Sequence, residues 1–180
     1  PNTEFYRQPP ILPEDDTLWA IQEAGQHRLA QAGLLQYEVS AYTHDKPSQH
    51  NLNYWKFGDY LAIGAGAHGK ITTPEGIFRY RKTRLPKDYL AAAPLQQARI
   101  GLEKINSEDL TFEFMMNALR LKNGVPQAYF TERTGLPLSH IEAQLRECEQ
   151  KGWISRHNQQ IACTDLGFNY LNEVLTFFLR

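Results

Sequence analysis

The segment HNLNYW, from His50 to Trp55, gathers several ligand-type side chains within a few positions. An imidazole such as that of His50 can serve as an axial ligand of haem iron, and the rings of Tyr54 and Trp55 could stack on a flat macrocycle. A structural explanation is also open, in which Asn51 and Asn53 hydrogen-bond loop backbone and Trp55 closes a core edge. A single histidine is a weak metal signal, so residue chemistry by itself favours the structural explanation.

A glycine-rich run follows at Gly64, Gly66 and Gly69, which match the spacing G-x-G-x-x-G. A dinucleotide site would need a helix that opens at the third glycine inside a βαβ unit. Here the sequence KITTPEG follows Gly69, and it predicts a β-like piece that leads into a turn. The run therefore predicts a place where backbone packs closely against backbone. It also leaves open a site where bare backbone groups, with His68 beside them, line a ligand.

The segment RYRKTR concentrates four positive charges, at Arg79, Arg81, Lys82 and Arg84. Arg79 and Arg81 share one face of a predicted strand. A solvated surface is the default explanation for such a strip. It could also meet the carboxylates of an acidic ligand, because arginine binds carboxylate groups in a bidentate manner.

The composition is that of an ordinary globular chain, with 180 residues, a formal net charge of −1, 42% apolar residues and 22% charged residues. It gives no global case for nucleic acid or for an anionic membrane, and no apolar run approaches the length that spans a bilayer. Cys148 and Cys163 are too few and too far apart to form a zinc or iron–sulfur ligand cluster. They are expected to be buried thiols in a reducing cytoplasm.

The first 104 residues predict a mixture of helices and strands. Apolar spacing indicates a helix over 15–33, followed at once by a strand over 34–42, which together would form half of a β/α unit. A polar loop should then lead into His50, with a short apolar strand over 60–67. One more strand is expected over 76–86, after a turn at Pro74–Gly76.

The composition changes near residue 105, where a helix-rich segment begins. Helices are expected over 107–123, 127–135 and 138–152, then a hairpin that turns near Asn158, and a final helix over 165–179 with Thr164 as its N-cap. This order suggests a winged-helix-like domain.

The second helix of winged-helix folds often enters the DNA major groove. In this chain that helix would carry more carboxylates than cations, because Glu142, Glu147 and Glu149 outnumber Arg146 and Lys151. Such a surface repels phosphate, so DNA binding is disfavoured. A module that docks on its own chain, or a non-enzymatic adaptor for protein partners, is the better interpretation of this region.

Several of these segments together resemble a known family. The segment EVSAYTHDKPSQHNLNYWKFGDYLAIGAGAHG, followed by RYRKTRLPKDYL, is similar to the C-terminal part of the oxygen-independent coproporphyrinogen III oxidase-like radical-SAM proteins. Within them it is closest to the branch regarded as haem chaperones. That branch carries an H-N-x-x-Y-W motif, a strand with Y-E that is matched at Tyr37 and Glu38, and a glycine run like Gly64–Gly69.

The resemblance implies a fold class of α/β plus α+β. Residues 1–104 would form the C-terminal part of a radical-SAM partial (β/α) barrel, and residues 105–180 a small winged-helix-like accessory domain. The sequence begins at Pro1 as if within a loop, and we expect it to be a piece of a longer protein. The family's [4Fe–4S] cluster and S-adenosylmethionine would be bound by residues upstream, because this sequence lacks the cysteine triplet of the family, and this piece alone would not perform radical chemistry.

The resemblance also implies a role in haem and porphyrin metabolism in the cytoplasm. The chaperone branch implies haem binding and delivery to haem-receiving proteins, while the oxidase branch implies oxidative decarboxylation of the propionates of coproporphyrinogen. The expected tetrapyrrole-binding residues are His50, with its imidazole as a possible iron ligand, together with Tyr54, Trp55 and His68. The backbone of Gly64, Gly66 and Gly69 would lie near the ligand, and its propionates would meet Arg79, Arg81 and Arg84.

Overall fold

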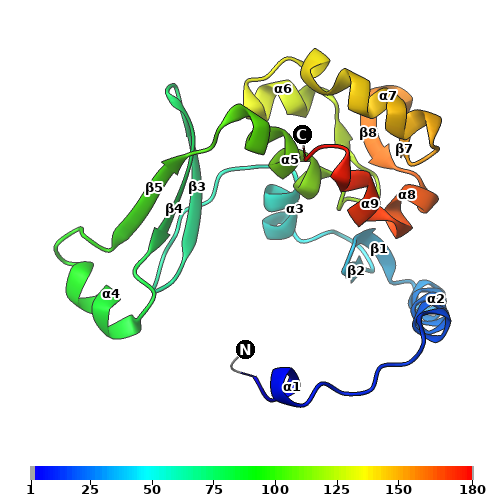
Figure 1. Cartoon of the computed structure of the whole chain (residues 1–180), viewed down its shortest axis with the longest axis horizontal. Helices are drawn as coiled ribbons and strands as arrows, with labels where there is room; N and C mark the ends of the chain where they lie inside the picture. Colours follow the sequence, from blue (N-terminus) through cyan, green and yellow to red (C-terminus); the bar gives the residue numbers. More distant parts are fainter. Residues whose placement is uncertain (1–2, 180) are drawn as a thin grey trace.

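The computed structural model describes residues 3–179. Short helices alternate with short strands along the chain, and Figure 1 shows them as a separate sheet on one side and a helical cluster on the other. Up to residue 104 the elements are α1 (Glu4–Arg7), α2 (Asp15–Gln31), β1 (Leu35–Glu38), β2 (Ala41–Thr43), α3 (Gln49–Trp55), β3 (His68–Thr73), β4 (Gly76–Lys82), α4 (Pro86–Ala92) and β5 (Arg99–Lys104).

From residue 105 onward, helices surround a small sheet. The elements are α5 (Ser107–Ala118), β6 (Val125–Pro126), α6 (Ala128–Thr134), the 3₁₀ helix η1 (Leu138–Ile141), α7 (Glu142–Gln150), β7 (Ile154–Ser155), the 3₁₀ helix η2 (His157–Gln159), β8 (Gln160–Cys163), α8 (Asp165–Asn169) and α9 (Leu171–Thr176). The succession of three helices, a hairpin and a C-terminal helical segment agrees with the sequence expectation. None of the helices in the described part of the chain combines the length and apolar character that crossing a bilayer requires.

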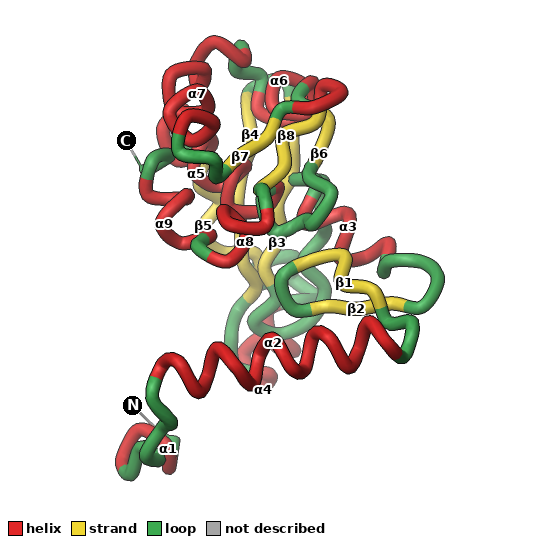
Figure 2. Tube along the Cα trace, turned by 90° about the vertical axis from the view of Figure 1, so that its right-hand side faces the viewer, coloured by secondary structure: helices red, strands yellow, loops and turns green. Residues whose placement is uncertain are grey.

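The strands form three small antiparallel sheets, with the orders β1-β2, β3-β4-β5 and β6-β8-β7. Figure 2 shows α2 lying along the β1–β2 hairpin. Within residues 3–179 no two strands pair in parallel, and the strands close no barrel. The chain is therefore a mixed α/β structure. Helix α2 is followed at once by strand β1, in the order expected over 15–42.

A hairpin replaces the single strand that the sequence predicts over 34–42. The Glu38 carboxylate accepts hydrogen bonds from the backbone N–H and the hydroxyl of Ser40, at 3.0 and 2.9 Å. This local bond turns the chain between β1 and β2. Apolar alternation continues through the turn, which is why it indicates one strand.

Two further segments of the first 104 residues bear on the site. A loop over 44–48 leads into His50, as expected, and His50 itself lies in helix α3, which Ser48 caps by accepting a hydrogen bond from the Asn51 N–H at 3.4 Å. The strand predicted over 60–67 is wrong. Its only bridge joins Tyr60 to Lys70, and Gly64 and Gly66 adopt left-handed φ values of 97° and 71°.

The main core comes from residues 105–179. Phe114, Met115, Phe130 and Phe178 are fully buried there, and the Phe114 ring packs edge-to-face on Phe130 with 5.3 Å between centroids. Met116, the next residue along α5 after the buried Met115, is 37% exposed. The predicted final helix is interrupted at Tyr170, which has non-helical φ and ψ of −111° and 37° and divides it into α8 and α9.

Candidate functional site

Helix α3 presents two faces with different surroundings. His50 and Tyr54, four positions apart, lie next to each other on one face, with their rings 4.7 Å apart and nearly perpendicular. Tyr54 in turn packs edge-to-face on Tyr60, with 4.6 Å between ring centroids. We call His50, Tyr54 and Tyr60 the aromatic row. Its first member, His50, is exposed, so its imidazole is accessible to a ligand.

The other face of α3 fastens the helix to the rest of the molecule. The Asn51 amide donates a hydrogen bond to the Tyr37 hydroxyl at 3.0 Å. The guanidinium carbon of Arg120 lies 4.3 Å from the centre of the Trp55 ring, which is a cation–π contact. Arg120 also donates to the carboxylate of Glu38, at 3.0 Å. Asn51 and Trp55 therefore join α3 to the β1–β2 hairpin and to the end of α5.

The Glu38 carboxylate depends on this arrangement, because its side chain is only 2% exposed. A buried carboxylate needs charged or hydrogen-bonding partners, and Arg120 and Ser40 supply them. Sequence reasoning missed Arg120. It lies 82 positions from Glu38, and no local pattern joins residues so far apart.

A small pocket of about 130 Å³ lies behind the aromatic row, lined in part by Tyr54, Tyr60, Lys70 and Arg79. The Lys70 side chain is 2% exposed, and its Nζ donates to Asp59 Oδ1 at 2.9 Å. Burial lowers the pKa of Lys70, and the bond to Asp59 opposes that shift. Burial tends to raise the pKa of Asp59, but hydrogen bonds from Lys70 and Thr72 outweigh it, so the net pKa of Asp59 is lowered.

The three arginines expected to meet propionates differ in their pairing. Arg79 donates through Nε and Nη2 to one oxygen of Glu113, at 3.0 and 2.6 Å, so its charge is compensated within the chain. Arg81 and Arg84 are exposed and line an open groove of about 630 Å³ together with Gly66 and His68. Lys82, which also belongs to the basic segment, lines the same groove.

The glycine run is held by its own hydrogen bonds. The Gly66 N–H donates to the Thr83 carbonyl at 2.9 Å, and the Gly64 N–H donates to the Tyr89 hydroxyl at 3.3 Å. These two N–H groups are therefore not free for a ligand. At Gly69 the ring of Tyr80 occupies the space that a Cβ would need, as expected for closely packed backbone.

The predicted residues thus fall into two places. His50, Tyr54 and Trp55 lie on α3, whereas His68, Gly66, Arg81 and Arg84 lie around the groove at one end of the sheet β3-β4-β5. Figure 1 shows α3 beside the helical cluster and the strand ends near α4 on the far side of the sheet. The lining of the groove includes no residue of α3.

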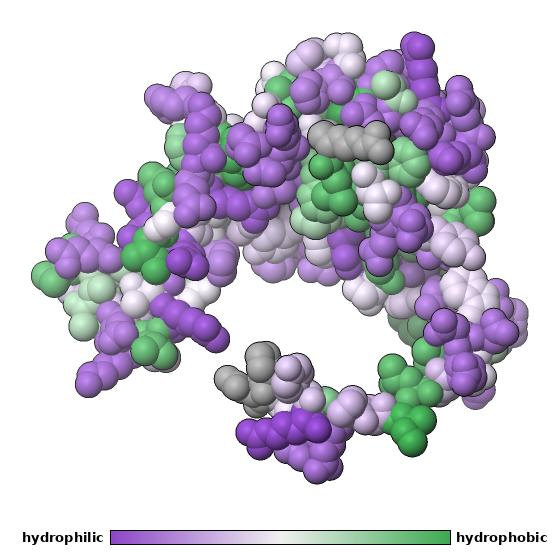
Figure 3. Space-filling view, viewed as in Figure 1, coloured by the Kyte–Doolittle hydropathy of each residue, from purple (hydrophilic) through white to green (hydrophobic). Residues whose placement is uncertain are grey.

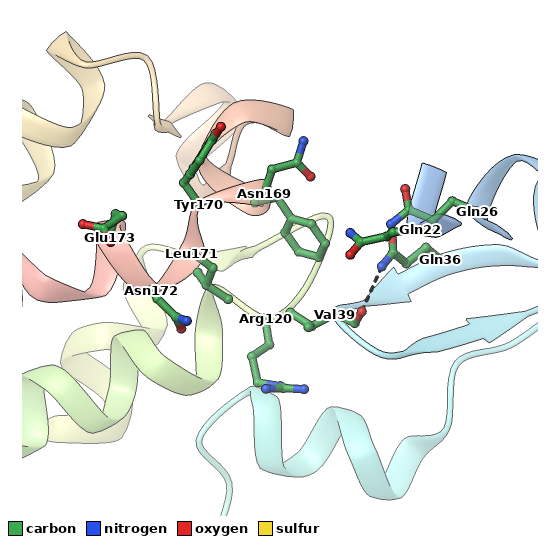
Figure 4. Close-up of a pocket in the computed structure, with 11 residues that line it drawn as sticks. Gln22, Gln26, Gln36, Val39, Arg120, Asn169, Tyr170, Leu171, Asn172 and Glu173 are labelled. Carbon is green, nitrogen blue, oxygen red and sulfur yellow. Dashed lines mark hydrogen bonds between the residues drawn. The ribbon is translucent and has the colours of Figure 1, made fainter. Parts of the chain in front are cut away.

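A further cleft, of about 430 Å³, separates α2 and the β1–β2 hairpin from α8 and α9. Figure 4 shows the amide side chains of Gln22, Gln36 and Asn172 around it, with Arg120 at its lower edge. Gln36 donates to the Val39 carbonyl at 3.0 Å. The lining offers hydrogen bonds but no nucleophile paired with a base, so it indicates no catalytic chemistry.

The described residues offer no metal cluster. Among residues 3–179, no three His, Cys, Asp or Glu side chains gather where they could hold a metal ion. Burial raises the pKa of Cys148 to about 11 and that of Cys163 to about 12, so both thiols stay protonated and are poor ligands. A [4Fe–4S] cluster therefore does not fit this part of the chain.

Comparisons with known proteins give consistent matches. The family profile of the HemN C-terminal domain matches residues 105–169. The chain is 46% identical over 181 residues to the heme chaperone HemW of Haemophilus influenzae, and 44% identical over 183 residues to that of Escherichia coli. Each alignment covers 99% of this chain, but only 46% and 47% of the relative. The chain therefore spans about half the length of these curated relatives.

A solved structure has a similar fold. It is the coproporphyrinogen III oxidase HemN from Escherichia coli, described as a radical SAM enzyme, with a TM-score of 0.62 and 13% identity. The similarity covers 93% of this chain and 42% of the oxidase chain. At this identity the likeness concerns the fold alone.

Proposed function

We propose that this chain belongs to the family of the heme chaperone HemW, to which it is 46% and 44% identical, and that the protein it forms part of binds haem and delivers it to other proteins. The observation that carries the proposal is the exposed imidazole of His50 at the end of the aromatic row. A neutral imidazole ligates haem iron axially, and aromatic rings beside it favour a flat macrocycle.

The residues of the H-N-x-x-Y-W motif have separate tasks in this proposal. His50 ligates the iron, and Tyr54 contacts the macrocycle together with Tyr60. Trp55 acts as a positioning residue, because its ring already contacts the Arg120 guanidinium. Asn51, bonded to Tyr37, helps to fix the direction of α3. A ligand held on a fixed helix loses less entropy than one held on a mobile loop.

The radical-SAM features of the family are also part of this proposal, but they concern the full-length protein. We propose that residues 1–104 form the C-terminal part of a partial (β/α) barrel, and that the [4Fe–4S] cluster and S-adenosylmethionine are bound by residues of the full-length, cytoplasmic protein outside this chain. The alternative, decarboxylation of coproporphyrinogen, is supported by the fold likeness to the oxidase at 13% identity. The identities of 46% and 44% to chaperones support the first function.

The central experiment titrates haem into the full-length protein and its His50→Ala variant. Loss of an axial ligand should raise the Kd about tenfold or more, and it should shift the Soret band. His140→Ala is the matched control, because His140 is also exposed but lies on η1 in the other part of the chain. An unchanged Kd and Soret band in His50→Ala would overturn the assignment of the ligand.

A second experiment separates chaperone from oxidase. The full-length protein with its cluster and S-adenosylmethionine is incubated with coproporphyrinogen, and the products are analysed by mass spectrometry. The haem-loaded protein is mixed with a haem-free haemoprotein, and transfer is followed by absorbance. We expect transfer without loss of carboxylate; decarboxylation without transfer would favour the oxidase instead.

A further inference from the structure

The groove at the end of the sheet β3-β4-β5 is lined by several basic side chains and by no acidic one. Arg81, Lys82 and Arg84 line it, together with His68, and no carboxylate is among its lining residues. A second groove of about 380 Å³ shares Lys82 and adds Arg99, again without a carboxylate. The two grooves thus bring four basic side chains, those of Arg81, Lys82, Arg84 and Arg99, to one end of the sheet.

These cations lack partners that other basic residues of the chain possess. Arg79, Arg120 and Arg156 each form an ion pair with a glutamate at 3.0 Å or less. Within residues 3–179, no ion pair involves Arg81, Lys82, Arg84 or Arg99. Arg79 lies on the same strand, β4, and it does pair with a carboxylate, that of Glu113. The lack of an ion pair is therefore specific to the end of the strand.

The register of the sheet places two cations opposite each other, because Lys82 on β4 is the direct partner of Arg99 on β5. Like charges directly opposite on antiparallel strands are destabilising. An anion bound between them would relieve this repulsion.

Backbone hydrogen bonds hold the groove in shape. The Lys82 N–H donates to the Ala67 carbonyl at 2.7 Å, and the Thr83 N–H donates to the Ala98 carbonyl at 2.9 Å. These bonds join the glycine run, the end of β4 and the segment before β5. The backbone that carries these basic side chains therefore has a defined conformation.

We propose that this groove binds a small molecule that carries two or more carboxylate or phosphate groups. Arginine forms paired hydrogen bonds with both kinds of group. The volume of about 630 Å³ is in the range of small-molecule sites. The groove is inferred from charge and shape alone, so it does not rest on haem binding at His50.

Two anionic probes test the groove in the full-length protein. Inorganic pyrophosphate is titrated by calorimetry, and metal-free protoporphyrin IX by quenching of tryptophan fluorescence. Protoporphyrin has two carboxylates but no iron, so His50 cannot ligate it. The dimethyl ester of protoporphyrin IX has the same ring but no charged carboxylate, so it serves as the uncharged control.

The decisive variant is Arg81→Gln with Arg84→Gln. It should raise the Kd of at least one anionic probe about tenfold or more. The control, Lys87→Gln with Arg146→Gln, removes two exposed charges that do not line the groove, and it should change the Kd less than about twofold. Arg81→Lys with Arg84→Lys keeps the charge and should recover part of the affinity, which separates binding from misfolding.

Each outcome has a defined meaning. An effect on protoporphyrin but not on its ester identifies carboxylates as the ligand group, and an effect on pyrophosphate alone identifies phosphates. Unchanged Kd values for both probes in the Gln variant would overturn the groove as an anion site. An equal loss in the control would also overturn it, because net charge would then explain the effect.

Discussion

Residues 105–179 and residues 3–104 differ in how they cover their apolar side chains. Most of the buried apolar residues that the structure describes belong to 105–179. In the first part, α2 buries none of its residues, and Trp19 and Ile21 are 41% and 59% exposed. Figure 3 shows apolar surface on the N-terminal arm, which stands clear of the sheet in this view.

The comparison shows where most of the core lies. The core consists mainly of buried side chains of residues 105–179, with Phe57 and Ile77 of the first part packed into it. The first part depends on a few connections to it, among them the packing of Phe57 on Phe114 and the pairs Glu38–Arg120 and Arg79–Glu113. Helix α3, with the candidate ligand His50, lies among these connections. Substitutions in the core, at the connections and on the bare faces should therefore have effects of decreasing size.

The largest effect is expected in the core. Phe114→Ala removes a ring that is 0% exposed and packs on both Phe57 and Phe130. The cavity should lower the free energy of unfolding of the chain by about 3–5 kcal/mol, measured by urea titration. The matched change Phe5→Ala removes a ring that is 74% exposed and should cost less than about 0.5 kcal/mol. Equal losses in the two variants would contradict the contrast between the parts.

The next effect concerns the connection at Arg120. Arg120→Met leaves the Glu38 carboxylate, 2% exposed, without its cation, and should cost about 3 kcal/mol in the same measurement. Arg146→Met breaks an exposed pair with Glu142 on one helix and should cost about 0.5 kcal/mol.

In the full-length protein, Arg120→Met should also weaken haem binding, because the contact that positions Trp55 is lost. A haem Kd equal to that of the unchanged protein would leave Arg120 with a role in stability only.

A pH-dependent effect follows from the pair of Asp59 and Lys70. The pKa of Asp59 is lowered in the folded chain below its usual 3.8, so the carboxylate stabilises the fold above that pH. This contribution is lost as the pH falls through the folded pKa. Asp59→Asn should therefore be less stable than the unchanged chain near neutral pH, by about 1 kcal/mol because the carboxylate is 44% exposed and solvent screens the pair, and the two should converge in strong acid. Urea midpoints measured from pH 7 downward test this, and a constant difference at every pH would contradict it.

The smallest effect is expected on the bare face of α2. Ile21→Glu replaces an exposed apolar side chain, so the unfolding free energy of the chain should change by less than about 0.5 kcal/mol. The variant should also self-associate less, because exposed apolar surface favours association. Light scattering measures this association. A large loss of stability would contradict the contrast between residues 3–104 and residues 105–179, because it would mean that α2 packs closely on the rest of the chain.

The part of the site that could be predicted from the sequence is the part set by local chemistry. The H-N-x-x-Y-W segment, the glycine run and the basic segment were all singled out by residue type. Their division between helix α3 and the groove at the end of the sheet was not predictable. The structure pairs Arg79 with Glu113, 34 positions away, and Trp55 with Arg120, and such distant pairs leave no periodic signal in a single sequence.

The sequence by itself determined the helices and turns that short-range interactions specify. Ile141, Leu145 and Cys148 recur at helical spacing and are buried, Thr164 caps α8, and Asn158 forms the hairpin turn with a φ of 51°. These depend on neighbours a few positions apart. Only the tertiary structure decided which face of α3 stays free and which basic residues keep an unpaired charge, because both depend on partners brought from distant parts of the chain.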